Sequence, residues 1–292
     1  MIPAPVDYAR PSSVDEALAM LAEHGDSAKL LAGGQSLIPL MKFRLAAPER
    51  LIDIGRIGEL RGIRASDGGF RIGALTTYAE ALEHDGLCAA YPLMREVLND
   101  IGDLQVRNKG TIGGALAHAD PASDMPALAM ALNGEVEIRS RDGTRRVPVT
   151  DFTLGAFTTD LAPGEILIAL HLPPLPRGAG TAWAALSQAA SGYSLVGVAA
   201  VVGDVHGVIG QGTVSHVSVA ITGVGEAPYR ATAVERALIG TACNETDLDA
   251  AAAHATDGQT VASDIHADAE YRTELTRIYT RRALSKALER AG

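Results

Sequence analysis

The first segment whose residues could bind a ligand runs from Ala32 to Ser36 and reads Ala-Gly-Gly-Gln-Ser, directly after a short apolar run. Gly33 and Gly34 let the backbone adopt positive φ angles and let a ligand approach closely. Successive amide N–H groups in such a bend can converge on an anion. Gln35 and Ser36 add side-chain donors. A plain turn between a strand and a helix is the alternative interpretation.

A second segment, Thr111-Ile112-Gly113-Gly114-Ala115, repeats this design, with a hydroxyl beside two adjacent glycines that lead toward a helix. Two such loops suit a pyrophosphate, because it presents two anionic groups. Neither loop fits the G-x-G-x-x-G dinucleotide fingerprint or the G-x-x-x-x-G-K-[ST] phosphate loop. A dinucleotide bound here would therefore be held by a different fold.

His118, Asp120 and Asp124 form the pattern H-x-D-x-x-x-D. Imidazole and carboxylate groups are metal ligands, but no H-E-x-x-H motif or cysteine pair supports a metal site, and we predict none. Asp124 directly precedes a helix expected from about Met125 to Leu132, a position typical of an N-cap. Its functional alternative is to accept a hydrogen bond from a ligand hydroxyl.

The composition describes a globular and acidic protein. Of 292 residues, 47% are hydrophobic and 21% charged, with a net charge of −10 and no basic tract, which argues against nucleic-acid or membrane-surface binding. No apolar run is long enough to span a membrane, and the N-terminus lacks a signal-peptide pattern. Cys88 and Cys243 are too few to hold an iron–sulfur cluster and indicate a reducing compartment, the cytoplasm. Without G-x-S-x-G or an activated cysteine, we predict no catalytic side chain.

Helix and strand signals divide the chain into two parts. Capping boxes at Thr77-Glu80 and Thr232-Glu235 predict helix starts. Three β-rich runs, at 181–190, 195–203 and 214–224, follow an extended proline-rich segment that ends at Pro176. The architecture is therefore α+β, with domains at 1–175 and 176–292.

A long final helix is expected from Ala269 to Arg290. It carries Arg272, Arg277, Arg281 and Arg282, which we interpret as a solvated helix face, with a partner-binding face as the alternative.

Residues 32–37 and the segment 101–132, IGDLQVRNKGTIGGALAHADPASDMPALAMAL, closely resemble the FAD-binding medium subunit of molybdenum hydroxylases. This family contains the carbon monoxide dehydrogenase medium subunit and the flavin domain of xanthine dehydrogenase, and the resemblance covers nearly the whole chain. It implies a two-lobed FAD-binding domain of the vanillyl-alcohol-oxidase (PCMH) type, with lobes at about 1–55 and 56–175. A C-terminal domain with a three-stranded antiparallel sheet and helices follows.

The resemblance also implies which residues bind the cofactor. The two diglycine loops would wrap the FAD pyrophosphate, Ile101 and Leu161 would pack against its rings, and Asp124 would bind a cofactor hydroxyl. Tyr193 would lie near the isoalloxazine. The expected FAD-binding residues are Ala32, Gly33, Gly34, Gln35, Ser36, Ile101, Thr111, Ile112, Gly113, Gly114, Ala115, His118, Asp124, Leu161, Ser187 and Tyr193.

The sequence departs from the family pattern at two of these positions. Ala115 stands where the family commonly has asparagine, which removes one side-chain donor. Ser187 stands where a basic residue is common. A nearby cation favours the anionic reduced flavin, so we predict a lower reduction potential in this protein.

The function implied is an FAD-carrying electron-transfer subunit of a molybdenum hydroxylase. It would accept electrons from the iron–sulfur clusters of a small subunit, in a heterohexamer-type assembly with a large molybdopterin-binding subunit. It would pass them to an external acceptor such as NAD, a quinone or oxygen. The alternatives are a free-standing flavin oxidoreductase of the same fold and a flavin-free assembly protein.

Overall fold

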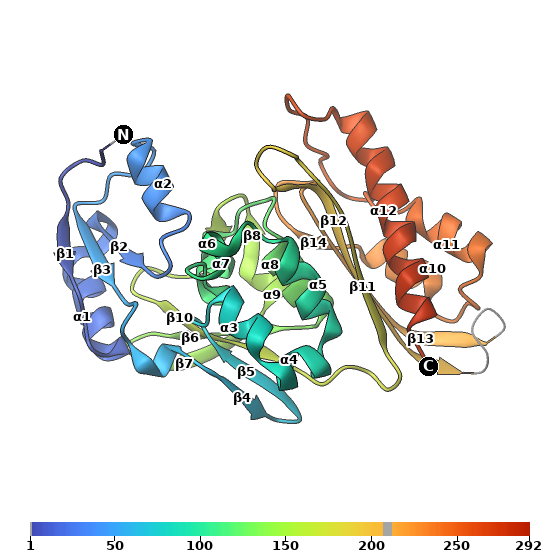
Figure 1. Ribbon diagram of the computed structural model, residues 1–292, viewed down its shortest axis with the longest axis horizontal. Coiled ribbons are helices and arrows are strands. Elements are labelled where there is room, and N and C mark those ends of the chain that lie inside the picture. The colour runs from blue at the N-terminus through green and yellow to red at the C-terminus, as the bar shows by residue number, and fades with distance from the viewer. Residues whose placement is uncertain (1, 207–211) are drawn as a thin grey trace.

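The computed structural model describes residues 2–206 and 212–292. They form three blocks side by side along the long axis of the molecule (Figure 1). A small sheet stands at one end, a helix-covered second sheet in the middle, and the C-terminal sheet with its helices at the other end. The α+β prediction is confirmed. No helix within the described ranges is long and apolar enough to cross a membrane.

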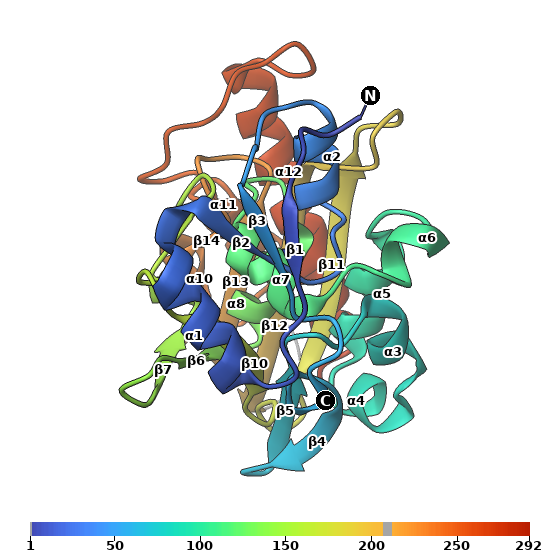
Figure 2. The ribbon, with the colours of Figure 1, turned by 90° about the vertical axis from the view of Figure 1, so that its left-hand side faces the viewer.

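The first block is a parallel three-stranded sheet in the order β1-β3-β2, seen in Figure 2 with α1 beside it. The Ser13 hydroxyl caps α1 by accepting from the Glu16 amide at 3.1 Å. The elements of this block are β1 Asp7–Ala9, α1 Val14–His24, the 3-10 turn Gly25–Ser27, β2 Ala28–Leu31, α2 Leu37–Lys42, β3 Arg50–Asp53 and the 3-10 turn Gly58–Leu60.

The second block is a five-stranded antiparallel sheet in the order β4-β5-β10-β6-β7 with helices packed against it. The capping box predicted at Thr77 is present at the start of α3. The elements are β4 Ile63–Ser66, β5 Gly69–Gly73, α3 Tyr78–Glu83, α4 Asp85–Ala90, α5 Pro92–Asp100, α6 Leu104–Arg107, α7 Ile112–His118, α8 Asp124–Ala131, β6 Glu135–Arg139, β7 Thr144–Pro148, α9 Val149–Phe152, β8 Thr153–Gly155, β9 Thr158–Thr159 and β10 Ile166–Leu172.

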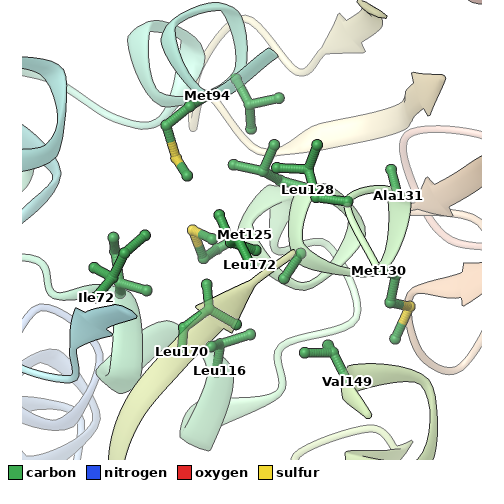
Figure 3. Packing of buried hydrophobic residues seen from close by; sticks show 14 of the residues in the cluster. Ile72, Met94, Leu116, Met125, Leu128, Met130, Ala131, Val149, Leu170 and Leu172 are labelled. Carbon is green, nitrogen blue, oxygen red and sulfur yellow. The ribbon is translucent and has the colours of Figure 1, made fainter. Parts of the chain in front are cut away.

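Helix α8 lies at the centre of the core, and every one of its residues is buried. Figure 3 shows Met125, Leu128 and Met130 of this helix among side chains from the sheet and from neighbouring helices. Its other side packs against β12 and β13 of the third block. After Asp124 the helix is apolar all round and must be covered on all sides, so α8 joins the middle and C-terminal blocks.

The third block is an antiparallel sheet in the order β11-β12-β13-β14. Three long strands match the predicted three-stranded sheet, and the short β14 adds a fourth at its edge. The elements are β11 Gly180–Ser187, β12 Ser194–His206, β13 Thr213–Thr222, β14 Tyr229–Arg230, α10 Thr232–Leu238, α11 Glu245–Ala252 and α12 Ala269–Glu289.

Two local predictions in this block are wrong. Thr232 does not cap α10: Ala231 is the N-cap, and the Glu235 carboxylate instead accepts from the Val219 amide at 2.8 Å. Arg272 is not on a solvated face, because it is only 3% exposed and its guanidinium is held by backbone carbonyls. The side chains of Glu235 and Arg272 therefore bond to distant segments and do not have the roles that local spacing indicated.

Candidate functional site

A cavity of about 680 Å³ lies where the three blocks meet. Its size falls within the range of small-molecule and cofactor sites. The walls come from β2, α2 and the loop between them, from the segments around α7 and α8, and from the turn between β11 and β12. That turn and α2 lie on the same side of the molecule in both ribbon views (Figures 1 and 2).

The two diglycine loops meet in this cavity although about 80 residues separate them. Gly33 lies against the second loop so closely that an added Cβ would stand 1.9 Å from the Lys109 carbonyl oxygen. A Cβ on Gly114 would lie 3.9 Å from the Cβ of Ala32. Only glycine fits at position 33, because no real Cβ atom comes within 1.9 Å of a backbone oxygen.

The first loop presents its backbone amides without partners. Within the described part of the chain, the N–H groups of Gly33, Gly34, Gln35 and Ser36 donate no hydrogen bond. Gly34 has a φ of +73°, a left-handed conformation that bends the chain between β2 and α2. All four residues line the cavity. The loop therefore offers a run of donors suited to an anion.

The second loop differs, because its amides are engaged within the protein. The Ile112 amide donates to the Thr76 carbonyl at 3.0 Å and the Gly113 amide to the Ala74 carbonyl at 2.9 Å. The Gly114 amide donates to the Thr111 hydroxyl at 3.1 Å. The Thr111 hydroxyl keeps its own proton to donate, and Thr111 lines the cavity. The second loop thus offers a hydroxyl and a close backbone surface.

Asp124 places an unpaired carboxylate oxygen at the cavity wall. The residue is 6% exposed, and its Oδ1 has no hydrogen-bond partner among the described residues. It is not the N-cap of α8 as predicted, because Ser123 occupies that position. Burial raises the pKa of Asp124 to about 7, against a smaller opposing effect of the Ser194 hydroxyl. A buried polar atom without a partner indicates a missing hydrogen-bond donor.

The other predicted residues separate into two groups. Ile101, Ala115, His118, Leu161 and Tyr193 all line the cavity. Two predicted residues do not line it. The Ile112 side chain is buried in the core, and Ser187 is exposed at the end of β11.

Sequence reasoning missed several residues of the wall. Lys29 lines the cavity from β2, and the lone charge in that apolar run was the available signal. Tyr78 also lines it, and its ring lies 2.8 Å from the Cβ position of Gly110. Burial raises the pKa of Tyr78, with smaller contributions from nearby Asp124 and Tyr193. No sequence signal connects Tyr78 to Asp124, because the fold alone brings them together.

The H-x-D-x-x-x-D pattern does not assemble a metal site within the described ranges, where no group of three potential ligands converges. The Asp120 carboxylate instead accepts from the Ala122 amide at 2.9 Å and so shapes the loop before α8.

The donor set fits a dinucleotide. Among the described residues, the wall combines amides without acceptors, a threonine hydroxyl, an unpaired carboxylate oxygen and apolar side chains. A diphosphate, a sugar or polyol hydroxyl and flat rings would match these groups in turn.

Comparison with known protein families agrees with a dinucleotide-binding site. Residues 4–175 match the model described as FAD binding domain in molybdopterin dehydrogenase. Residues 181–287 match the CO dehydrogenase flavoprotein C-terminal domain. The chain belongs to the FAD-binding medium subunits of molybdenum hydroxylases. The resemblance noted in the sequence is thereby confirmed, and FAD is the cofactor of this family's binding domain.

The relatives match this family member from end to end. The carbon monoxide dehydrogenase medium chain of Afipia carboxidovorans is 40% identical, over 100% of this chain and 99% of its own length. Subunit alpha of the 6-hydroxypseudooxynicotine dehydrogenase complex of Paenarthrobacter nicotinovorans is 37% identical, over 100% and 97%. Carbon monoxide dehydrogenase from Hydrogenophaga pseudoflava, solved without its Mo-pyranopterin moiety, superposes with a TM-score of 0.96 at 40% identity over 100% of both chains. The relatives are subunits of dehydrogenases, which makes this chain a flavoprotein subunit of an oxidoreductase.

Proposed function

We propose that the cavity holds FAD and that this chain is the electron-transfer subunit of a heteromeric molybdenum hydroxylase. One observation carries the proposal: four consecutive amides that donate to no described residue meet a second glycine loop in a cavity of cofactor size. Membership of an FAD-binding family supports it.

Each polar group of the wall has a defined task in this proposal. The amides of Gly33 to Ser36 donate to the diphosphate, and the Thr111 hydroxyl adds a further donor. Asp124 accepts a hydrogen bond from a cofactor hydroxyl, which gives its unpaired Oδ1 a partner. Lys29 contributes a positive charge at the same wall.

The apolar part of the wall would receive the rings. Ile101 and Leu161 are half-buried, and Tyr193 is 51% exposed at the turn between β11 and β12. Aromatic and aliphatic side chains exclude water from one side of a flat ring and orient it. His118 lies beside the Phe157 ring, with centroids 5.1 Å apart, and borders the same space.

When bound, FAD supplies the capacity to take up and release electrons, and the protein supplies binding, orientation and electrostatic surroundings. Electrons would come from iron–sulfur clusters of a small subunit and ultimately from a large molybdopterin-binding subunit, in a heterohexamer-type assembly. They would leave to NAD, a quinone or oxygen. We assign no side chain of this chain a proton-transfer role toward the primary substrate.

Relatives of nearly equal identity carry names with different substrates. One is a carbon monoxide dehydrogenase chain, one a 6-hydroxypseudooxynicotine dehydrogenase chain and one a glyceraldehyde dehydrogenase chain. This supports a role in which another subunit selects the oxidised compound.

We also propose a division into two domains at about residue 175. The family models end and begin on either side of the proline-rich segment, at 175 and 181.

Copurification tests the proposal. The chain is tagged in its native host and isolated under mild conditions, and bound flavin and accompanying subunits are identified. The proposal predicts FAD together with a large and a small cysteine-rich partner. Substrate turnover by the isolated chain would instead identify a free-standing oxidoreductase, and an assembled protein without flavin would identify an assembly factor.

A further inference from the structure

Arg272 on α12 is a buried cation whose guanidinium donates four hydrogen bonds to described residues. It is 3% exposed. Its Nη1 donates to the carbonyls of Leu195, at 2.8 Å, and Gly223, at 2.6 Å. Its Nε donates to the Ala262 carbonyl at 3.1 Å, and its Nη2 to the Asp264 carboxylate at 2.8 Å. Burying a charge is costly unless it is paired and hydrogen-bonded, and four of the five N–H donors of this guanidinium have partners.

Leu195 and Gly223 mark the place where the C-terminal sheet reaches the cavity. Leu195 is the second residue of β12 and follows Tyr193 and Ser194 directly. Tyr193 lines the cavity, and the Ser194 hydroxyl is buried without a hydrogen-bond partner among the described residues, close enough to Asp124 to influence its pKa. Anchoring the Leu195 carbonyl therefore restrains the stretch of backbone that carries these two side chains.

Gly223 connects the same point to the opposite wall. It follows β13 with a φ of +78°, and its amide donates to the Pro121 carbonyl at 3.0 Å. The neighbouring Thr222 hydroxyl lies within hydrogen-bond distance of the Pro121 and Ser123 carbonyls, at 3.1 and 2.9 Å. Residues 120 and 122–124 of this loop all line the cavity.

A substitution at Gly223 would be expected to disturb this junction. An added Cβ there would stand 2.4 Å from the Ser194 carbonyl oxygen. The start of β12, the end of β13 and the loop before α8 thus share one tightly packed junction.

We propose that Arg272 is a positioning residue of the flavin site. By binding the carbonyls of Leu195 and Gly223 with one nitrogen, it sets the distance between Tyr193 and Ser194 on one side and Asp124 on the other. Helix α12 does not line the cavity, but through these two hydrogen bonds it shapes the cavity wall. The inference rests on the proposed FAD site.

The test uses the protein assembled with its native partners and compares four forms with the wild type: Arg272→Met, Arg272→Lys, Arg277→Met and Leu284→Ala. Arg277 lies on the same helix and, among the described residues, pairs with Glu274 alone, on the surface, so it controls for loss of charge. Leu284 is a fully buried residue of α12 in the C-terminal core, so its truncation controls for lost stability. The readouts are FAD release in increasing chaotrope, the circular dichroism of the bound flavin, and the pH dependence of FAD release.

Arg272→Met is expected to release FAD about tenfold more readily, because the carbonyls of Leu195 and Gly223 lose their donor and the junction relaxes. Its flavin circular dichroism and its pH profile of release should both change, since Ser194 moves relative to Asp124. In Arg272→Lys, FAD release and the flavin circular dichroism should lie between those of the wild type and Arg272→Met. The single ammonium of lysine can replace only some of the hydrogen bonds of the planar guanidinium. Arg277→Met and Leu284→Ala should keep the wild-type spectrum and pH profile.

If Arg272→Met fails to assemble, Arg272→Lys alone decides by the same readouts. Wild-type behaviour of the assembled Arg272 variants would overturn the inference, and so would equal spectral changes in Leu284→Ala. A wild-type protein without FAD would instead overturn the proposed function on which the inference stands.

Discussion

Gly33 lies directly against the Lys109 carbonyl, with room for a hydrogen but none for a methyl group: a Cβ would stand 1.9 Å from that oxygen. This contact joins the loop after β2 to the loop before α7. It brings a row of free amides beside the Thr111 hydroxyl. Both loops line one cavity of about 680 Å³.

Gly33→Ala should therefore separate the two loops. We expect a loss of about 1–3 kcal/mol of folding stability from overpacking and a marked loss of bound FAD. Gly58→Ala is the matched control, because nothing lies within 4 Å of its Cβ position. Flavin-to-protein ratios of the assembled variants give the answer. Full FAD content in Gly33→Ala would show that the loop contact does not matter.

Thr111→Val should weaken FAD binding and α7 together. The substitution removes the acceptor for the Gly114 amide, at a cost of about 1 kcal/mol, and removes a donor from the cavity. Thr77→Val removes a similar helix cap at α3, outside the cavity wall. Thermal unfolding should show a loss of stability in both variants, whereas FAD titration should show weaker binding only in Thr111→Val. Equal FAD affinities in the two variants would contradict the role of Thr111.

The buried Asp124 should make the FAD-free protein less stable as pH rises. Its pKa is raised from 3.8 to about 7 in the folded chain, so the unfolded chain releases the proton first. Stability is lost progressively between about pH 4 and pH 7, by roughly 2–4 kcal/mol. Asp124→Asn stays neutral and should lack this loss. Denaturant unfolding of both proteins at pH 5 and pH 8 measures the difference, and parallel pH profiles would refute the assignment.

FAD retention should show the opposite pH trend. A hydroxyl donor favours the ionised carboxylate, so retention should be stronger at pH 8 than at pH 6. The trend should vanish in Asp124→Asn. Equilibrium dialysis at both pH values tests this, and an unchanged trend in the variant would assign the titration to another group.

Ser187→Lys should raise the flavin reduction potential, because a nearby cation favours the anionic reduced ring. Ser187 is exposed and does not line the cavity. We therefore expect the reduction potential to rise by less than about 20 mV, since an exposed charge outside the cavity wall contributes less than about 1 kcal/mol. Spectroelectrochemical titration of wild type and variant measures it. An unchanged reduction potential would show that the residue at position 187 does not influence the flavin.

Local signals predicted much of the architecture. The capped start of α3, the strand before Gly33 and the apolar run of α8 after Asp124 follow from spacing that neighbouring residues set themselves. The two diglycine loops are also recognisable in the sequence, because each places adjacent, conformationally free glycines beside side-chain donors.

The sequence could not reveal the contacts between segments that lie far apart along the chain. Arg272 has the spacing of a surface arginine, and only the approach of β12 and β13 buries it. The amides of Ile112 and Gly113 were expected to face the ligand, yet they bond to Thr76 and Ala74 on another segment. Tyr78 reaches the cavity because Gly110 leaves room for its ring. Each of these depends on tertiary contacts that no local pattern encodes.

The central claim is that the loop from Gly33 to Ser36 and Thr111 together hold the diphosphate of FAD. A crystal structure of the protein assembled with its native partners tests it most directly. We predict density for FAD in this cavity, with its diphosphate against the amides of the first loop and a cofactor hydroxyl on Asp124. A fully assembled protein with an empty cavity, or with FAD bound elsewhere, would contradict the account.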